Sequence, residues 1–407
     1  MGKKILKKTN KWIYILASIL LLAYSIPNPY IKVILFASVF YSAWIFNLCN
    51  TTLLMLITSM LLDANISTII LIIATFPAYA GPSLKSIKLY RNKILYSIVF
   101  LLALLISVLL GEDPNIRTMI LYILCWVAYL SASNDNYSEE DIKSYAIAGI
   151  LIVFVVIVIA AINGNIKLMY GRLSINDNIR ELANAVSVPL YLLFISLIKC
   201  IEQKKKKNIT LYAGILFGTY ILLATLSRGA IFTIAMGIIV MFFMARVSTH
   251  KKIIYAGILI CVAIVIIGYL STNDFLRMER LFNSSDGLNG REEIWLSYWN
   301  EMNRDTTTLF FGFGPGDVRR LNVQTSYTHS LILDILFSYG FVGFSLAGVL
   351  VSEIVIKALK AKNATALGTV TFAVLTYATH GVSTAVAFYI MLGLAKQMIE
   401  KHKKREN

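Results

Sequence analysis

Charged residues are scarce in this sequence. Only 15% of the 407 residues are charged, whereas soluble proteins carry roughly 25%. Hydrophobic residues make up 57% of the chain. Apolar stretches of about 16 to 20 residues recur along it, each long enough to cross the hydrocarbon core of a bilayer. Because so little polar surface is available to cover a soluble core, the composition excludes a soluble globular protein. It predicts an all-α, polytopic transmembrane helical bundle.

Cysteine and histidine are also rare, with four residues of each type. The cysteines stand singly in apolar stretches without metal-site spacing and are interpreted as small core residues: Cys49, Cys125, Cys200 and Cys261. The net charge is +16. The basic residues do not gather on one soluble face, which argues against nucleic acid as a partner. They occupy short loops, where they set the orientation in the membrane.

The apolar stretches predict about 12 to 14 spans. They lie at 12–27, 31–48, 49–62, 66–82, 93–110, 116–133, 144–162, 183–201, 209–226, 229–245, 252–270, 333–357, 364–379 and 382–398. The spans 49–62 and 66–82 are short, which is typical of a broken or re-entrant pair. The lysine-rich start resembles a signal peptide but is interpreted as leading into an uncleaved first span.

Placing the N-terminus in the cytoplasm puts every strongly basic short loop on one side, as the positive-inside rule requires. Residues 1–270 then form the first eleven spans, and residues 271–330 form one long extracytoplasmic loop. Residues 331–407 form the last spans and a basic cytoplasmic tail. A second outer loop runs from 163 to 182.

Lysine and arginine are distributed differently in this topology. All lysines except Lys32 and Lys167 face the cytoplasm. Most arginines lie outside: Arg117, Arg172, Arg180, Arg228, Arg277, Arg280, Arg291, Arg304, Arg319 and Arg320. Since arginine binds phosphate or carboxylate bidentately, the outer face is predicted to bind an anion. The alternative for the arginines of the long loop other than Arg291 is pairing with the acids of that loop.

Two arginines are the strongest candidates for that anion contact. Arg228, in LATLSRGAIF, lies between two apolar runs with no acid nearby in sequence. An ionisable group at membrane depth usually marks a site, although an arginine reaching lipid headgroups is the alternative. Arg291 begins a stretch that predicts a short amphipathic helix, where free N–H groups can help to hold phosphate. The apolar face of that helix comprises Ile294, Trp295, Tyr298, Trp299 and Met302.

Weaker candidates lie elsewhere on the predicted outer face. Arg172 and Arg180 are further anion contacts, Asn184 is a sugar contact, and His380 lies between the last two spans. The segment FFGFGPGD lacks the Lys and Ser/Thr of a phosphate loop. It predicts a tight turn anchored by Phe310, Phe311 and Phe313.

His329 lies where the long outer loop runs into an apolar helix, in SYTHSLILDILFSYGFVG. A neutral imidazole can accept a proton from an attacking hydroxyl near pH 7, which makes His329 a candidate base. Ser330 beside it is a candidate contact for the acceptor. The alternative is a histidine that only marks the membrane interface.

Three segments together resemble the bacterial O-antigen ligase and O-antigen polymerase family. They are TLSRG at 225–229, GREEIW at 290–295 followed by FFGFGPG at 310–316, and HSLILDILFSYG at 329–340. The last segment fits the ligase-type pattern of His, a small polar residue, Leu and Gly. The order of the segments and the late outer loop also resemble the family.

The resemblance implies a GT-C-like fold and transfer of a whole glycan from undecaprenyl pyrophosphate at the outer side of the bacterial inner membrane. It implies no metal, cofactor or nucleotide sugar. Arg228 and Arg291 would bind the pyrophosphate, with Arg172 or Arg180 as a further contact, and His329 would activate the acceptor hydroxyl for inverting attack. The region of Arg172 departs from the family's usual Gly/Pro/Asn-rich form.

The expected activity is a polymerase of O-antigen or a related polysaccharide, working with a chain-length regulator and a flippase of the same pathway. A ligase that moves the glycan onto lipid A–core or a protein shares the chemistry and stays open. A third alternative is a flippase for lipid-linked oligosaccharides. It would need ionisable residues deep in several spans, and the late spans contain chiefly Asp334 and Glu353.

Overall fold

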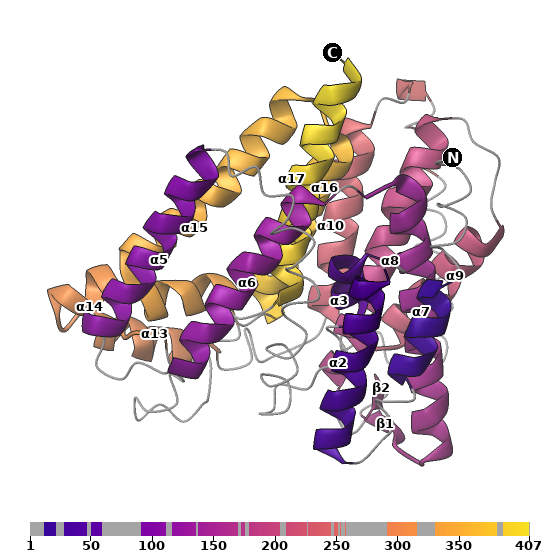
Figure 1. The fold of residues 1–407 in the computed structure, drawn as a ribbon, viewed down its shortest axis with the longest axis horizontal. Coiled ribbons are helices and arrows are strands. Elements are labelled where there is room, and N and C mark those ends of the chain that lie inside the picture. The colour runs from indigo at the N-terminus through magenta and orange to yellow at the C-terminus, as the bar shows by residue number, and fades with distance from the viewer. Residues whose placement is uncertain are drawn as a thin grey trace. The chain divides into compact units, whose positions relative to one another are not determined.

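The computed structural model describes residues 12–21, 28–46, 50–58, 91–110, 116–135, 137–169, 172–175, 179–203, 209–225, 227–245, 248–250, 253, 257, 291–315, 330–380 and 386–406 (Figure 1). The chain divides into two compact units. The first comprises Met1–Tyr79, Asn136–Ser284 and Lys362–Phe372. The second comprises Ala80–Asp135, Ser285–Ala361 and Ala373–Asn407.

The first unit is helical except for one hairpin. It contains α2 (Pro29–Ile45), α3 (Thr51–Thr58), α7 (Glu139–Ile162), β1 (Ile166–Met169), β2 (Arg172–Ile175), α8 (Ile179–Glu202), α9 (Ile209–Ala224), α10 (Arg228–Met244) and the start of α16 (Ala364–His380). Helix α8 lies at its centre and packs against α7, α9 and α10. The face-to-face rings of Tyr191 and Phe372, 4.1 Å apart between centroids, join α8 to the start of α16.

Helix α7 begins at a signal that is local in sequence. Asp141 N–H donates to Ser138 Oγ at 3.0 Å, and Ser138 N–H donates to Asp141 Oδ2 at 2.8 Å, which together make a capping box. At the same end, Gln203 Nε2 donates to the Glu139 carboxylate at 2.8 Å. The start of α7 is therefore fixed by polar contacts, while its remaining turns are almost entirely apolar.

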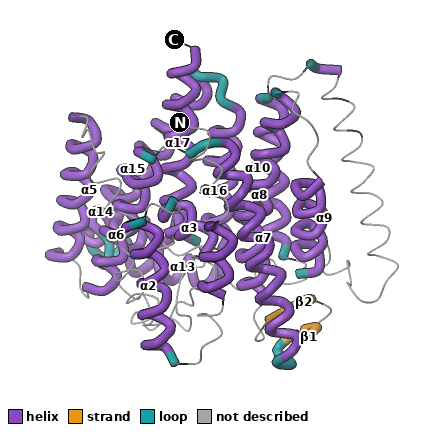
Figure 2. Tube along the Cα trace, turned by 45° about the vertical axis from the view of Figure 1, so that its right-hand side comes forward, coloured by secondary structure: helices purple, strands orange, loops and turns teal. Residues whose placement is uncertain are grey.

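The hairpin follows α7 and lies at the C-terminal end of that helix (Figure 2). Its strands are antiparallel, with Ile166 opposite Ile175 and Met169 opposite Arg172. It falls in the segment predicted as the second outer loop, and the sequence pattern does not predict it because each strand has only four residues. Strand β2 packs against α8.

The second unit contains α5 (Arg91–Leu110), α6 (Ile116–Asn134), α13 (Arg291–Met302), α14 (Thr306–Phe311), α15 (Leu331–Lys360), the end of α16 and α17 (Val386–Glu406). Helices α6 and α17 form its most extensive contact. Lys396 of α17 is buried there. Its Nζ lies 3.1 Å from the Tyr129 hydroxyl and 5.5 Å from the centroid of that ring. This lysine is therefore part of the helix packing and not only an orientation signal.

Each predicted span that falls on described residues coincides with a helix. Span 66–82 and almost all of 252–270 lie outside the described residues. Three of the described helices are long and apolar enough to cross a membrane: Glu139–Ile162, Leu182–Glu202 and Leu331–Lys360. The fold is that of an all-α, polytopic helical membrane protein.

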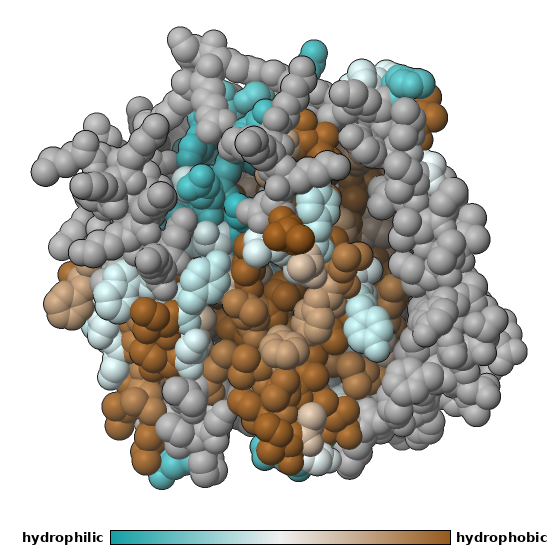
Figure 3. Space-filling model, turned by 90° about the vertical axis from the view of Figure 1, so that its right-hand side faces the viewer, coloured by the Kyte–Doolittle hydropathy of each residue, from teal (hydrophilic) through white to brown (hydrophobic). Residues whose placement is uncertain are grey.

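Large apolar side chains are exposed on several helices, as expected where a protein surface meets lipid tails. On α9, Ile209 is 82% exposed and Leu216 is 72% exposed. Figure 3 shows a face on which apolar side chains form most of the coloured surface. A soluble protein would rarely leave so much contiguous apolar surface in contact with water.

Candidate functional site

Helix α15 starts directly after the predicted catalytic histidine. Ser330 is its N-cap residue, in extended conformation and buried, and its carbonyl oxygen accepts from Asp334 N–H at 2.8 Å. Asp334 is also buried, in the first turn, where the helix dipole favours a carboxylate. His329 itself lies outside the described residues. The N-cap at Ser330 means that α15 begins directly after His329 in the sequence.

Helix α15 is kinked at Gly340, the last residue of the ligase-type pattern. Gly340 has φ +60° and ψ −165°, a conformation that essentially only glycine adopts. This break frees carbonyl groups in the preceding turn from the helical ladder. Phe337 O accepts from Phe313 N–H at 2.9 Å, and Ser338 O accepts from Gly314 N–H at 3.1 Å. The kink therefore creates two acceptors that hold the glycine turn of residues 312–314.

Gly312 makes the reciprocal contact. Its φ is +77° and its ψ −178°, and a Cβ there would lie 2.4 Å from the carbonyl group of Ser338. A Cβ at Gly340 would lie 2.3 Å from the carbonyl group of Phe310. Real Cβ atoms do not come so close to backbone, so both positions require glycine for space as well as for conformation. We call this contact the glycine clasp: Gly312 and Gly340, with the hydrogen bonds of residues 313 and 314.

Ser107 of α5 completes the clasp from a third segment. Its hydroxyl lies 2.8 Å from Ser338 O and 2.9 Å from Phe311 O, and the side chain is buried. Ser107 is not among the residues predicted from the sequence. The available signal is only a small polar residue within an apolar span.

The turn is thus held differently from the prediction. Phe310 was expected to anchor it, but its side chain is 48% exposed, and this part of the prediction is wrong. Instead, backbone hydrogen bonds to α15 hold the turn in place. Phe313 does pack against an apolar cluster, as predicted.

That cluster also holds α13, the predicted short helix of the long loop. Its buried members are Ile294, Tyr298 and Met302 of α13 with Leu336 and Phe337 of α15. The rings of Tyr298 and Phe337 lie 5.1 Å apart between centroids. The amphipathic pattern is confirmed for these three residues and for Trp295, which packs at the edge of the cluster, whereas Trp299 is 39% exposed.

Arg291 is the first residue of α13, as predicted, and the packing of that helix fixes the backbone from which its side chain extends. The side chain itself is not described. Among the other arginines of the loop, Arg304 forms an exposed ion pair with Glu301 at 2.7 Å. Pairing with a loop acid, the alternative to anion binding, is therefore confirmed for Arg304. Arg277, Arg280, Arg319 and Arg320 lie outside the described residues.

The remaining candidates belong to defined elements. Arg228 is the first residue of α10 and follows the buried N-cap residue Ser227, so the predicted turn between two apolar helices is confirmed. Arg172 begins β2, and Arg180 lies in the first turn of α8. The side chains of these three arginines are not described.

Two polar candidates lie on apolar helices. Asn184 is partly buried on α8, and His380 is the last residue of α16, with a side chain that is not described. Their proposed contacts with substrate stay predictions.

Residues 213–348 match the sequence model of a family described as O-antigen ligase. The matched segment begins in α9 and ends in α15, and it includes Arg228, Arg291 and His329 as well as both glycines of the clasp. No curated protein matches the chain. The match supports the assignment of this chain to the O-antigen ligase and polymerase family, which the three sequence segments indicated.

Proposed function

We propose that this protein polymerises a surface polysaccharide by transferring an undecaprenyl-pyrophosphate-linked glycan, as one block, to a sugar hydroxyl at the outer side of the bacterial inner membrane. The observation that carries the proposal is the family match over residues 213–348, because this segment contains the predicted base His329 and both of the strongest arginine candidates, Arg228 and Arg291.

The reaction needs a base for the acceptor and fixed positive charge for the leaving diphosphate. His329 takes the proton of the acceptor hydroxyl, whose oxygen attacks the anomeric carbon and inverts it. Arg228 and Arg291 bind the diphosphate, on which negative charge develops as the glycosidic bond breaks. Arg172 or Arg180 is a further contact, and Ser330, Asn184 and His380 are contacts for the sugars.

In the described part of the site, packing and hydrogen bonds link two of the elements that carry these groups. The glycine clasp and the cluster around Tyr298 and Phe337 connect the start of α13 to the start of α15 within one unit. Arg291 and Ser330 stand at those two helix starts. Groups that stabilise a transition state act best when their backbone does not have to reorganise.

A ligase that transfers the same donor to lipid A–core is the second candidate, and the description of the matched family favours it. Lipopolysaccharide from a deletion strain separates the two. A core that carries a single repeat unit supports the polymerase. Loss of all O-antigen from the core, with polymer retained on the carrier lipid, overturns the polymerase and supports the ligase.

A further inference from the structure

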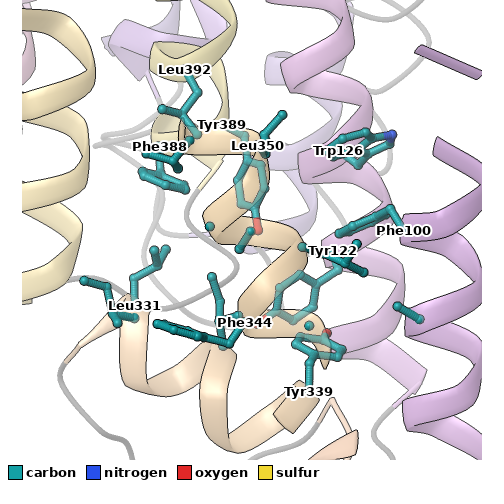
Figure 4. A pocket seen from close by; sticks show the side chains of 18 of the residues that line it. Phe100, Tyr122, Trp126, Leu331, Tyr339, Phe344, Leu350, Phe388, Tyr389 and Leu392 are labelled. Carbon is teal, nitrogen blue, oxygen red and sulfur yellow. The ribbon is translucent and has the colours of Figure 1, made fainter. Parts of the chain in front are cut away.

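An apolar cavity of about 240 Å³ lies within the second unit. Helices α5, α6, α15, α16 and α17 contribute its walls. Phe100 and Trp126 stand on one side, and Phe388 and Leu392 stand on the other (Figure 4). Its volume exceeds the roughly 150 Å³ of an engineered apolar cavity that binds benzene. The space is therefore large enough for part of a hydrocarbon chain.

The lining restricts the chemistry of an occupant. No charged residue is among the described residues that line the cavity. The indole N–H of Trp126 is already used, since it donates to Ser97 Oγ at 3.1 Å. Apart from the hydroxyls of Tyr122, Tyr339 and Tyr389, the walls offer aromatic and aliphatic surface. Such walls gain dispersion contacts when hydrocarbon fills the cavity and have little to offer a polar ligand.

The helices that border the cavity also expose apolar side chains. Leu101 and Leu105 of α5 are exposed, as are Phe341 and Val349 of α15. In a membrane protein such surfaces contact lipid tails, so hydrocarbon is the medium from which an occupant comes.

The cavity begins beside the candidate site. Leu331, Ile332 and Ile335, in the first turns of α15, line it, and Leu331 directly follows Ser330. A chain in the cavity can thus reach the start of α15, the helix end that directly follows His329 in the sequence.

We propose that this cavity binds the isoprenoid chain of the lipid-linked glycan donor. The proposal rests on the proposed function, in which Arg228 and Arg291 bind the diphosphate and His329, the residue before Ser330, acts at the anomeric carbon. The cavity holds the end of the chain nearest the diphosphate and thereby sets the position of the anomeric carbon relative to His329.

Gly348 offers a direct test. It lines the cavity, and a Cβ added there meets nothing within 4 Å, so Gly348→Phe fills the space without moving the backbone. The matched control is Val349→Phe. Val349 is the next residue of the same helix, does not line the cavity and is 49% exposed.

The readout is photolabelling, which needs no turnover. The full-length protein in phospholipid vesicles is labelled with a polyprenyl pyrophosphate that carries a diazirine near its pyrophosphate end. We expect label on peptides of α6, α15 and α17, at least tenfold less label in Gly348→Phe, and no change in Val349→Phe.

Two results overturn the proposal. One is equal labelling of the Gly348→Phe and wild-type proteins. The other is labelling of the same peptides by a diazirine phospholipid that excess polyprenyl pyrophosphate does not displace, since the cavity then holds a bilayer acyl chain. A parallel transfer assay keeps the proposals separate: label in the cavity of a wild-type protein that transfers no glycan supports the cavity and counts against the proposed function.

Discussion

The Ser107 hydroxyl lies 2.8 Å from the carbonyl oxygen of Ser338, 231 positions further along the chain. The same hydroxyl lies 2.9 Å from Phe311 O, so one small side chain joins α5, the end of α14 and the kink of α15. Helix carbonyls that lose their intrahelical partner must find another donor when they are buried. Ser107 and the backbone N–H groups of residues 313 and 314 supply those donors, and the kink is stable for that reason.

Gly340→Ala is expected to disrupt the clasp. The observed backbone conformation costs a residue with a side chain about 1–3 kcal/mol, and the added methyl group also overlaps the backbone at Phe310. We expect a clear fall in the melting temperature of the purified protein in detergent and loss of glycan transfer.

Gly348→Ala is the matched control, because Gly348 is helical and has open space at its Cβ position. Alanine there should leave stability unchanged or raise it slightly, since alanine favours a helix over glycine. If both variants melted alike, the clasp would have no special role.

Tyr298→Ala is expected to release α13 from the second unit. Tyr298 is fully buried against Phe337, and removing a buried aromatic ring costs about 3–5 kcal/mol. Limited proteolysis should then cut residues 291–302 faster than in the wild type, and transfer should fall because Arg291 loses its fixed backbone. Leu296→Ala, on the same helix at a position that is 61% exposed, should change neither measurement. Equal protease resistance of Tyr298→Ala and wild type would contradict this role.

Helix α14 is expected to weaken at low pH. Asp305 is its N-cap residue, and the backbone N–H of Thr308 donates to its carboxylate at 2.9 Å, which lowers the pKa of Asp305 below its usual range. A lowered folded-state pKa gives stability that is complete above the unfolded pKa of about 3.9 and is lost as pH falls through the lower folded value.

Hydrogen-exchange protection of residues 306–311, corrected for intrinsic rates, measures this effect. In the wild type, protection should fall as the pH drops below about 3.9. In Asp305→Asn, which keeps an uncharged cap, protection should not show this fall. A step that persists in Asp305→Asn would assign it to another group.

Arg228→Lys is expected to impair transfer although it keeps the charge. Lysine cannot form the two parallel hydrogen bonds of a guanidinium with phosphate. Losing one hydrogen bond to a charged group costs about 1.5–3 kcal/mol, or roughly tenfold to a hundredfold in rate. Arg304→Lys is the control, because Arg304 already pairs with Glu301 on an exposed surface. An unimpaired Arg228→Lys variant would show that charge or membrane orientation is sufficient.

Helix positions could be predicted from the sequence because span length and apolar composition are properties of each segment alone. The turn at Ser227 and Arg228 and the buried side of α13 follow from the same local patterns. The distribution of arginines predicts an anion-binding outer face, but it does not show which arginines already pair with an acid of the protein. Arg304, which pairs with Glu301, is an example.

The clasp could not be predicted in this way. The family pattern includes Gly340, but the reason for a glycine there is the backbone of residues 310–312 and the hydroxyl of Ser107, which are remote in sequence. The cavity is likewise a property of five helices together. The burial of Lys396 against Tyr129 could not be predicted from the topology either, because it depends on the packing of α17 against α6.

The central claim is that this chain transfers a glycan from a polyprenyl pyrophosphate with His329 as the base. The most direct measurement is transfer from purified undecaprenyl-pyrophosphate-linked glycan by wild-type protein and by His329→Ala, both with EDTA present and at equal protein levels. We expect polymer from the wild type and none above background from His329→Ala. Wild-type activity in the variant would contradict the role of His329, and no transfer by the wild type in the presence of its acceptor would contradict the proposed function.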